Sequence, residues 1–145
     1  MRHPPNRIRR QEVTAMSNVL VAEDDPLLAD IIRFNLVRAG HHVSVARTGS
    51  IAIEMLKQSV PDVLMTDYQM PGANGEELCR FVREDLKNPD LPIIVCSAKG
   101  FELNAVDFKS RWAVTDIIFK PFSMNVITSL IGRLTFVGVG SSSQA

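Results

Sequence analysis

Five short runs of apolar residues recur along the chain, and each is followed by a polar loop and a longer amphipathic segment. The runs lie at residues 19–22, 43–46, 63–66, 92–96 and 116–119. They alternate little between apolar and polar positions, which is typical of strands that are buried on both faces. Because a helical segment follows each run, the pattern predicts a parallel five-stranded sheet with helices on both faces, an open doubly wound α/β domain.

The segments between these runs have apolar residues at helical spacing, which predicts helices. The first begins at Asp25-Pro26, a helix-capping residue followed by a proline in the first helical position, and ends before Gly40. The other four are expected at about residues 50–59, 75–87, 100–112 and 123–134, of which the fourth has the least regular pattern.

The two ends of the chain differ from the part between them. Residues 1–16 carry four arginines and one glutamate without a hydrophobic period, which predicts a flexible basic arm. Such an arm could bind an anionic partner or act in targeting. Four arginines are only a weak signal for either role, so an incidental extension is the favoured interpretation. Residues 136–145 are rich in glycine and serine and predict a tail that packs against nothing. The folded domain is therefore expected at residues 17–135.

The composition is that of an ordinary globular protein, with 46% hydrophobic and 22% charged residues. The chain has 16 basic and 16 acidic residues, and this zero balance argues against direct binding of nucleic acid through bulk charge. There is no apolar run of the roughly 18 residues that would predict a membrane span, and no secretory signal. Cys79 and Cys96 lie in apolar stretches and are expected to be buried free thiols, whereas His41 is expected at the surface. We expect a cytoplasmic protein that does not contact a membrane.

Polar residues stand at the carboxyl ends of four of the five predicted strands. They are Glu23, Asp24 and Asp25 after the first strand, Asp67 after the third, Ser97 after the fourth and Lys120 after the fifth. In a doubly wound sheet this edge is where ligands bind. Crowded carboxylates raise one another's pKa unless a cation neutralises them, and oxygen ligands without histidine or cysteine favour Mg²⁺, with Mn²⁺ as the other possibility. A lysine and a hydroxyl beside such a cluster indicate a site that handles a phosphoryl group.

Four segments at this edge resemble the response regulator receiver domain. They are residues 19–26, 61–72, 97–98 and 120–122, and the resemblance covers about residues 17–134. It implies a flavodoxin-like (βα)5 fold with strand order 2-1-3-4-5. It also implies a phosphoacceptor of a two-component system, which takes a phosphoryl group from a sensor histidine kinase or a histidine phosphotransfer protein and then switches the binding of an output protein. The domain would be a self-phosphorylating switch, for which autodephosphorylation is a further option, rather than an enzyme that turns over a substrate.

The resemblance implies a role for each metal-binding residue. Asp67 matches the phosphoacceptor, and Glu23 and Asp24 match the acidic pair that binds Mg²⁺. Asp24 would be a direct ligand, Glu23 would act through water, and the backbone carbonyl of Gln69 would be the third protein ligand. The metal set is therefore expected to be Glu23, Asp24, Asp67 and Gln69.

Other positions match the residues that respond to the phosphoryl group. Ser97 matches the switch hydroxyl, and Lys120 matches the lysine that pairs with the phosphoryl oxygens. The peptide bond between Lys120 and Pro121 is expected to be cis, as X–Pro bonds can be. The chain departs from the pattern at Ile117, where many members have a tyrosine or phenylalanine whose rotation accompanies switching. The switch would then use loop and backbone shifts, or another residue.

Three positions keep two interpretations open. Gln69 and Lys99 could shield the phosphoryl group from water, or could be solvated side chains. Trp112 could anchor a partner or cover an edge of the core, and the second interpretation is slightly favoured. If the domain self-associates, we expect at most a weak homodimer through the face formed by the fourth helix, fifth strand and fifth helix.

Alternatives from other classes remain. The chain could be an interaction module that keeps the receiver fold without phosphorylation, although its complete set of acidic, hydroxyl and lysine residues argues against this. It could be a Mg²⁺-dependent phosphatase, but those usually carry the nucleophile on the first strand. No output domain follows the fifth helix, so we expect a stand-alone receiver that signals through protein contacts; a receiver fragment of a larger hybrid kinase or regulator is the other possibility.

Overall fold

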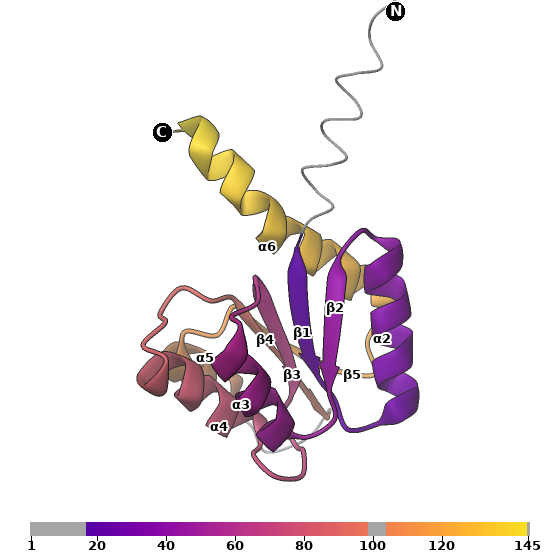
Figure 1. Cartoon of the computed structure of the whole chain (residues 1–145), viewed down its shortest axis with the longest axis vertical. Coiled ribbons are helices and arrows are strands. Elements are labelled where there is room, and N and C mark those ends of the chain that lie inside the picture. Colours follow the sequence, from indigo (N-terminus) through magenta and orange to yellow (C-terminus); the bar gives the residue numbers. More distant parts are fainter. Residues whose placement is uncertain (1–16, 99–103, 145) are drawn as a thin grey trace, which may run out of the picture.

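The structure is a computed structural model that describes residues 17–98 and 104–144. Five parallel strands form one sheet in the order β2-β1-β3-β4-β5, which confirms the expected order (Figure 1). The strands are β1 (Asn18–Ala22), β2 (His42–Ala46), β3 (Val63–Asp67), β4 (Ile93–Ala98) and β5 (Asp116–Lys120). Each lies within two residues of its predicted position at either end.

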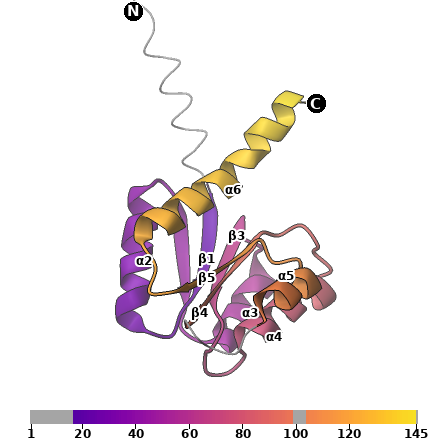
Figure 2. The same ribbon diagram turned by 180° about the vertical axis from the view of Figure 1, so that it is seen from behind.

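Helices cover both faces of this sheet, as the apolar strands require. The helices are α2 (Pro26–Arg38), α3 (Gly49–Gln58), α4 (Gly75–Arg80), α5 (Ala105–Trp112) and α6 (Met124–Gln144), with a π-helical segment η1 (Phe81–Asp85) directly after α4. Helices α2 and α6 lie on one face, and α3, α4 and α5 lie on the other (Figures 1 and 2). Among the described residues, no helix is both long and apolar enough to cross a membrane.

The hydrophobic core consists of two layers separated by the sheet. Successive strand residues point to opposite faces, so Leu64 packs with Leu56 and Leu78 while its neighbour Met65 packs with Leu36 and Ile127. All five residues of β3 are buried. In a central strand such as β3, burial on both faces leaves polar side chains only the ends of the strand at which to reach water or a ligand.

The register of the strands aligns their carboxyl ends. Ala22 pairs with Thr66, and Asp67 pairs with Cys96 of β4. The residues that follow these pairs, Glu23 and Ser97, therefore reach the same edge as Asp67. Helix α2 begins at this edge as predicted, because the side chain of Asp25 accepts hydrogen bonds from the first backbone N–H groups of the helix.

Two predicted helices differ from those observed. The third is α-helical only from Gly75 to Arg80, and it continues as a π-helix in which Leu86 N–H donates to Phe81 C=O at 2.9 Å. Spacing of apolar residues does not separate these two kinds of helix, because a single wide turn shifts the pattern by only one residue. The last helix was expected to end near residue 134 but continues to Gln144. Adding residues to an existing helix costs much less free energy than starting one, so the glycines and serines of this segment did not end the helix.

Some predictions fall outside the described residues. These are the basic arm at residues 1–16, the beginning of the fourth predicted helix and Lys99.

Candidate functional site

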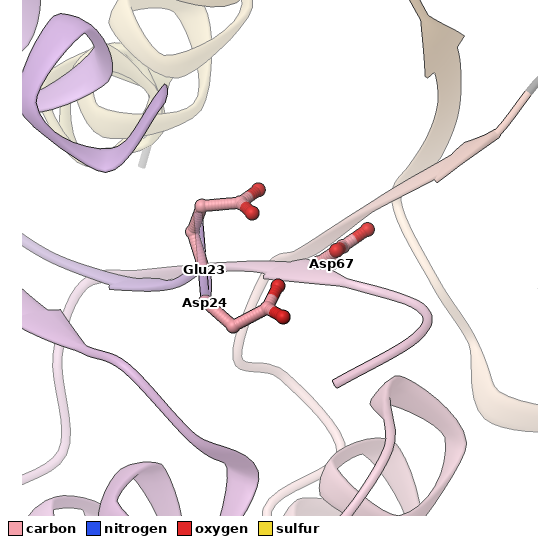
Figure 3. Close-up of side chains that lie close together, drawn as sticks. All are labelled: Glu23, Asp24 and Asp67. Carbon is pink, nitrogen blue, oxygen red and sulfur yellow. The ribbon is translucent and has the colours of Figure 1, made fainter. Parts of the chain in front are cut away.

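Three carboxylates meet at the carboxyl edge of the sheet. Glu23 and Asp24 follow β1, and Asp67 is the last residue of β3. Each offers an oxygen, and these oxygens all lie within 4.8 Å of one another (Figure 3). Glu23 is 3% exposed and Asp67 is 8% exposed, whereas Asp24 is exposed to solvent. The structure therefore brings together the three acidic side chains that the sequence analysis expected to bind the metal.

The electrostatics of this cluster favour a bound cation. Burial raises the pKa of Glu23 and of Asp67 above their ordinary values. The negative charge of Asp67 further raises the pKa of Glu23, and that of Asp24 further raises the pKa of Asp67. Buried, mutually repelling carboxylates that share one space are the donor set of a hard divalent cation, which would remove the repulsion.

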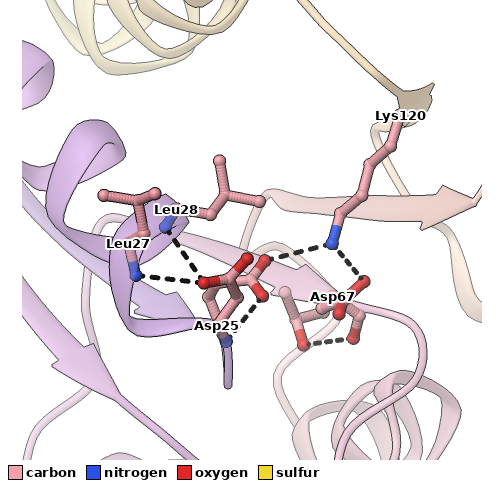
Figure 4. Close-up of polar contacts among 7 residues, drawn as sticks. Asp25, Leu27, Leu28, Asp67 and Lys120 are labelled. Atoms are coloured by element: carbon pink, nitrogen blue, oxygen red, sulfur yellow. Dashed lines mark hydrogen bonds and ion pairs between the residues drawn. The ribbon is translucent and has the colours of Figure 1, made fainter.

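Lys120 contacts two of the three carboxylates. Its Nζ lies 3.3 Å from Glu23 Oε1 and 3.3 Å from Asp67 Oδ1 (Figure 4). Burial lowers the pKa of Lys120, but Asp67 and Glu23 raise it by more, so the ammonium group stays charged at neutral pH. Lys120 is the last residue of β5, and its peptide bond to Pro121 is cis, as expected.

Ser97 is a buried hydroxyl in β4, one residue after the Cys96 that pairs with Asp67. It is 1% exposed, and its Oγ has no hydrogen-bond partner in the part of the chain that the structure describes. An unpaired buried hydroxyl costs about 1–3 kcal/mol. By contrast, the Thr66 hydroxyl is satisfied by the carbonyl of Asp67 at 2.9 Å. The Ser97 hydroxyl is thus available to donate to an incoming oxygen.

Asp25 has a structural role and is not a member of the carboxylate cluster. Its carboxylate accepts from Leu27 N at 3.0 Å and from Leu28 N at 3.5 Å, which caps α2 (Figure 4). Its own N–H donates to Glu23 Oε2 at 3.1 Å. Asp25 therefore orients Glu23 while its own carboxylate is directed toward the start of the helix.

The loop after β3 is held close to the site by a glycine that sequence reasoning missed. Gly75 N–H donates to Tyr68 C=O at 2.8 Å, and a Cβ atom at Gly75 would lie 2.7 Å from the backbone oxygen of Asp67. The only sequence signal was a glycine at the start of a predicted helix. Gln69, in the same loop, is exposed.

The comparison with protein-family models identifies this architecture. The model of the response regulator receiver domain matches residues 19–132. The chain belongs to this family. Its members are signalling switches, and accepting a phosphoryl group is their standard function, so the receiver-domain prediction is confirmed.

Solved structures of receiver domains have the same fold. The receiver domain of the Francisella response regulator 1452 is 28% identical with a TM-score of 0.75, and the match covers 82% of this chain and 96% of that one. A putative response regulator from Chloroflexus aurantiacus is 27% identical with a TM-score of 0.74, covering 82% and 97%. The receiver domain of a histidine kinase from Syntrophus aciditrophicus is 26% identical with a TM-score of 0.73, covering 82% and 89%.

Proposed function

We propose that Asp67 is the phosphoacceptor of this receiver domain, and that a phosphohistidine of a sensor kinase or of a histidine phosphotransfer protein is the donor. The observation that carries the proposal is the position of the Asp67 carboxylate, 3.3 Å from the Lys120 ammonium and next to Glu23 and Asp24 at the ligand-binding edge of the sheet. We assign this function to residues 17–135, which the family match at residues 19–132 supports.

The transfer forms one bond and breaks another. An oxygen of the Asp67 carboxylate attacks the phosphorus atom, and an O–P bond forms while the P–N bond of the donor breaks. The donor imidazole leaves with the electron pair of the P–N bond, and with one proton on its other ring nitrogen it departs as neutral imidazole. The product is an acyl phosphate on Asp67, and later hydrolysis would return the carboxylate. The domain itself is the acceptor in this step, so it does not turn over as an ordinary enzyme does.

Asp24, Glu23, Asp67 and the backbone carbonyl of Gln69 would hold Mg²⁺, and Mn²⁺ would suit the same oxygen donors. The observed fit rests on three carboxylates whose oxygens lie within 4.8 Å and on the raised pKa of the two buried ones. When bound, the cation offsets the negative charge that gathers on the transferred phosphoryl oxygens.

Two side chains would recognise the phosphorylated state. The Lys120 ammonium would exchange its contact with Asp67 for one with a phosphoryl oxygen, because the phosphoryl group carries more negative charge than the carboxylate. The buried Ser97 hydroxyl would donate to another phosphoryl oxygen and so acquire the partner it lacks among the described residues. Both shifts would move residues of β4 and β5. We propose that an output protein binds the neighbouring face, which is formed by α5, β5 and α6.

A reducing compartment suits this protein. Cys79 and Cys96 are both free and buried, which supports our proposal that the domain acts in the cytoplasm.

Phosphotransfer is tested by incubating the protein with acetyl phosphate and Mg²⁺ and measuring its intact mass. We expect the wild type to gain the mass of one phosphoryl group and Asp67→Asn to gain none. Asp30→Asn is a matched control, because Asp30 lies exposed on α2, and it should be labelled like the wild type. Absence of labelling on the wild type, or undiminished labelling of Asp67→Asn, would contradict the proposal.

A further inference from the structure

Strand β5 has no aromatic side chain placed to carry a signal from the phosphoacceptor edge. Ile117 is half-buried and packs against the core layer beneath α3, α4 and α5. Phe119, two residues further along β5, is 41% exposed. An aliphatic side chain has no ring to rotate between a buried and an exposed position, so coupling to α5 must use another contact.

Tyr68 supplies an aromatic contact that begins next to the phosphoacceptor. It directly follows Asp67, its N–H donates to Cys96 C=O at 2.8 Å, and its C=O accepts from Gly75 at 2.8 Å. These two hydrogen bonds tie its backbone to β4 and to the start of α4. Its ring meets the ring of Phe108 edge-on, with centroids 5.7 Å apart and the planes at 76°. Edge-to-face rings depend on angle as well as distance, so a movement of one displaces the other.

Phe108 is the residue through which α5 is embedded in the domain. It is 6% exposed and is the single buried side chain of α5, whereas Val106, two residues earlier on the helix, is 81% exposed. A movement of the Phe108 ring is therefore a movement of the apolar anchor of the whole helix.

The far end of α5 is held by polar contacts to the neighbouring helix. Trp112 Nε1 donates to Glu76 Oε2 at 3.0 Å, and the Arg111 guanidinium lies 3.5 Å from the same oxygen. From η1, Arg83 donates to the carbonyls of Trp112 and Ala113, each at 2.8 Å. These directional contacts lengthen or bend as soon as the helix turns, so Trp112 reports on the position of α5.

We infer that Tyr68 is the positioning residue that passes a change at Asp67 to α5 through the Phe108 ring, in place of an aromatic residue on β5. The inference rests on the proposed function, since it names how phosphorylation of Asp67 is read. Phosphorylation adds charge at Asp67, which draws in the groups around it and shifts the adjoining backbone of Tyr68. The Tyr68 ring then moves against Phe108, and α5 moves relative to Glu76.

The experiment uses the fluorescence of Trp112, which is the only tryptophan of the chain. Emission is recorded before and after acetyl phosphate and Mg²⁺ are added to the full chain, and intact mass measures labelling in the same samples. We expect the wild type to be labelled and its emission to shift. Phe108→Leu should be labelled to the same extent while the shift is lost, because leucine keeps an apolar anchor but has no ring.

A second pair of variants keeps the test decisive if Phe108→Leu does not fold. Tyr68→Phe retains the ring and should preserve the emission shift, whereas Tyr68→Leu should be labelled but lose it. Ile117→Val is the control on β5 and should respond like the wild type. A shift that persists in Tyr68→Leu, or one that is lost in Ile117→Val, overturns the inference while leaving the phosphoacceptor role of Asp67 intact. An unlabelled wild type overturns the proposed function, and the inference with it.

Discussion

Helices α2 and α5 are attached to the same sheet by different means. Helix α2 has 13 residues, and it buries Ala29, Ile32 and Leu36 against the sheet. Helix α5 has 8 residues, buries only Phe108, and depends on hydrogen bonds at its carboxyl end. The chemistry of the site is built beside α2, since Glu23 and Asp24 lead directly into that helix.

The difference indicates that the two sides of the domain are held with different firmness. Apolar burial is non-directional and holds a helix as long as the core is intact, so α2 keeps the acidic cluster in place. A helix with one buried side chain and several directional polar contacts is expected to open locally at a lower free energy than a helix with a broad apolar face. The side of the domain that holds α2 and the acidic cluster is therefore fixed, whereas the side that holds α5 is more easily displaced.

The largest effect is expected from removing the anchor of α2. Leu36 is 0% exposed, and Leu36→Ala should lower the free energy of unfolding by about 2–5 kcal/mol in urea titrations. Leu27→Ala on the same helix is the control, because Leu27 is 69% exposed and the change should stay within about 0.5 kcal/mol. Equal losses in the two variants would show that α2 is not held by its buried face.

Binding of a divalent cation should further stabilise the side of the domain that holds the acidic cluster. Because burial and mutual repulsion raise the pKa of Glu23 and Asp67, a cation that neutralises them stabilises the folded state. At Mg²⁺ concentrations of about 100 times Kd, the expected gain is about 2.7 kcal/mol, seen as a higher Tm that a chelator reverses. Asp24→Asn should remove most of this gain. An equal rise in Tm with a monovalent salt at matched ionic strength would mean that screening, not a site, is responsible.

Loss of the Arg83 contacts should loosen α5 while α2 stays fixed. Arg83 donates to the carbonyls of Trp112, Asn88 and Ala113. Arg83→Ala should cost about 1–2 kcal/mol, since freed carbonyls can turn toward water. It should speed hydrogen exchange of the α5 amides while exchange in α2 stays unchanged. Arg80→Ala is the control on α4, because Arg80 is exposed. Faster exchange in both helices would show that Arg83 does not act on α5 alone.

The smallest effect concerns pH and the end of α2. His41 is 6% exposed, and burial lowers its pKa below the ordinary value of about 6.5. The unfolded chain therefore binds a proton more readily, so stability should fall as the pH drops below about 6.5 and level off below the pKa of the folded state. His41→Gln should flatten this part of the profile in thermal melts at different pH. An unchanged slope would assign the acid sensitivity to other groups.

Much of the fold was readable because strands buried on both faces must be apolar throughout. The residues after Ala22, Thr66 and Cys96 must then lie at one edge of the sheet, so the sequence alone predicts the acidic cluster there. His41 was expected at the surface and is buried, because its position depends on how α2 packs above the start of β2. The ring contact between Tyr68 and Phe108 was also missed, since it joins residues far apart in sequence and follows no periodic pattern.

The burial of both cysteines has a practical consequence for spectroscopy. Burial raises the pKa of Cys79 to about 12 and that of Cys96 to about 12. At neutral pH both thiols are therefore almost entirely protonated. Alkylating reagents react with the thiolate, so we expect them to leave both cysteines unmodified in the folded protein. The chain has no other cysteine. A cysteine introduced at an exposed position of α5, such as Val106, would thus take up a spin label or fluorophore alone, and the native sequence needs no prior removal of thiols.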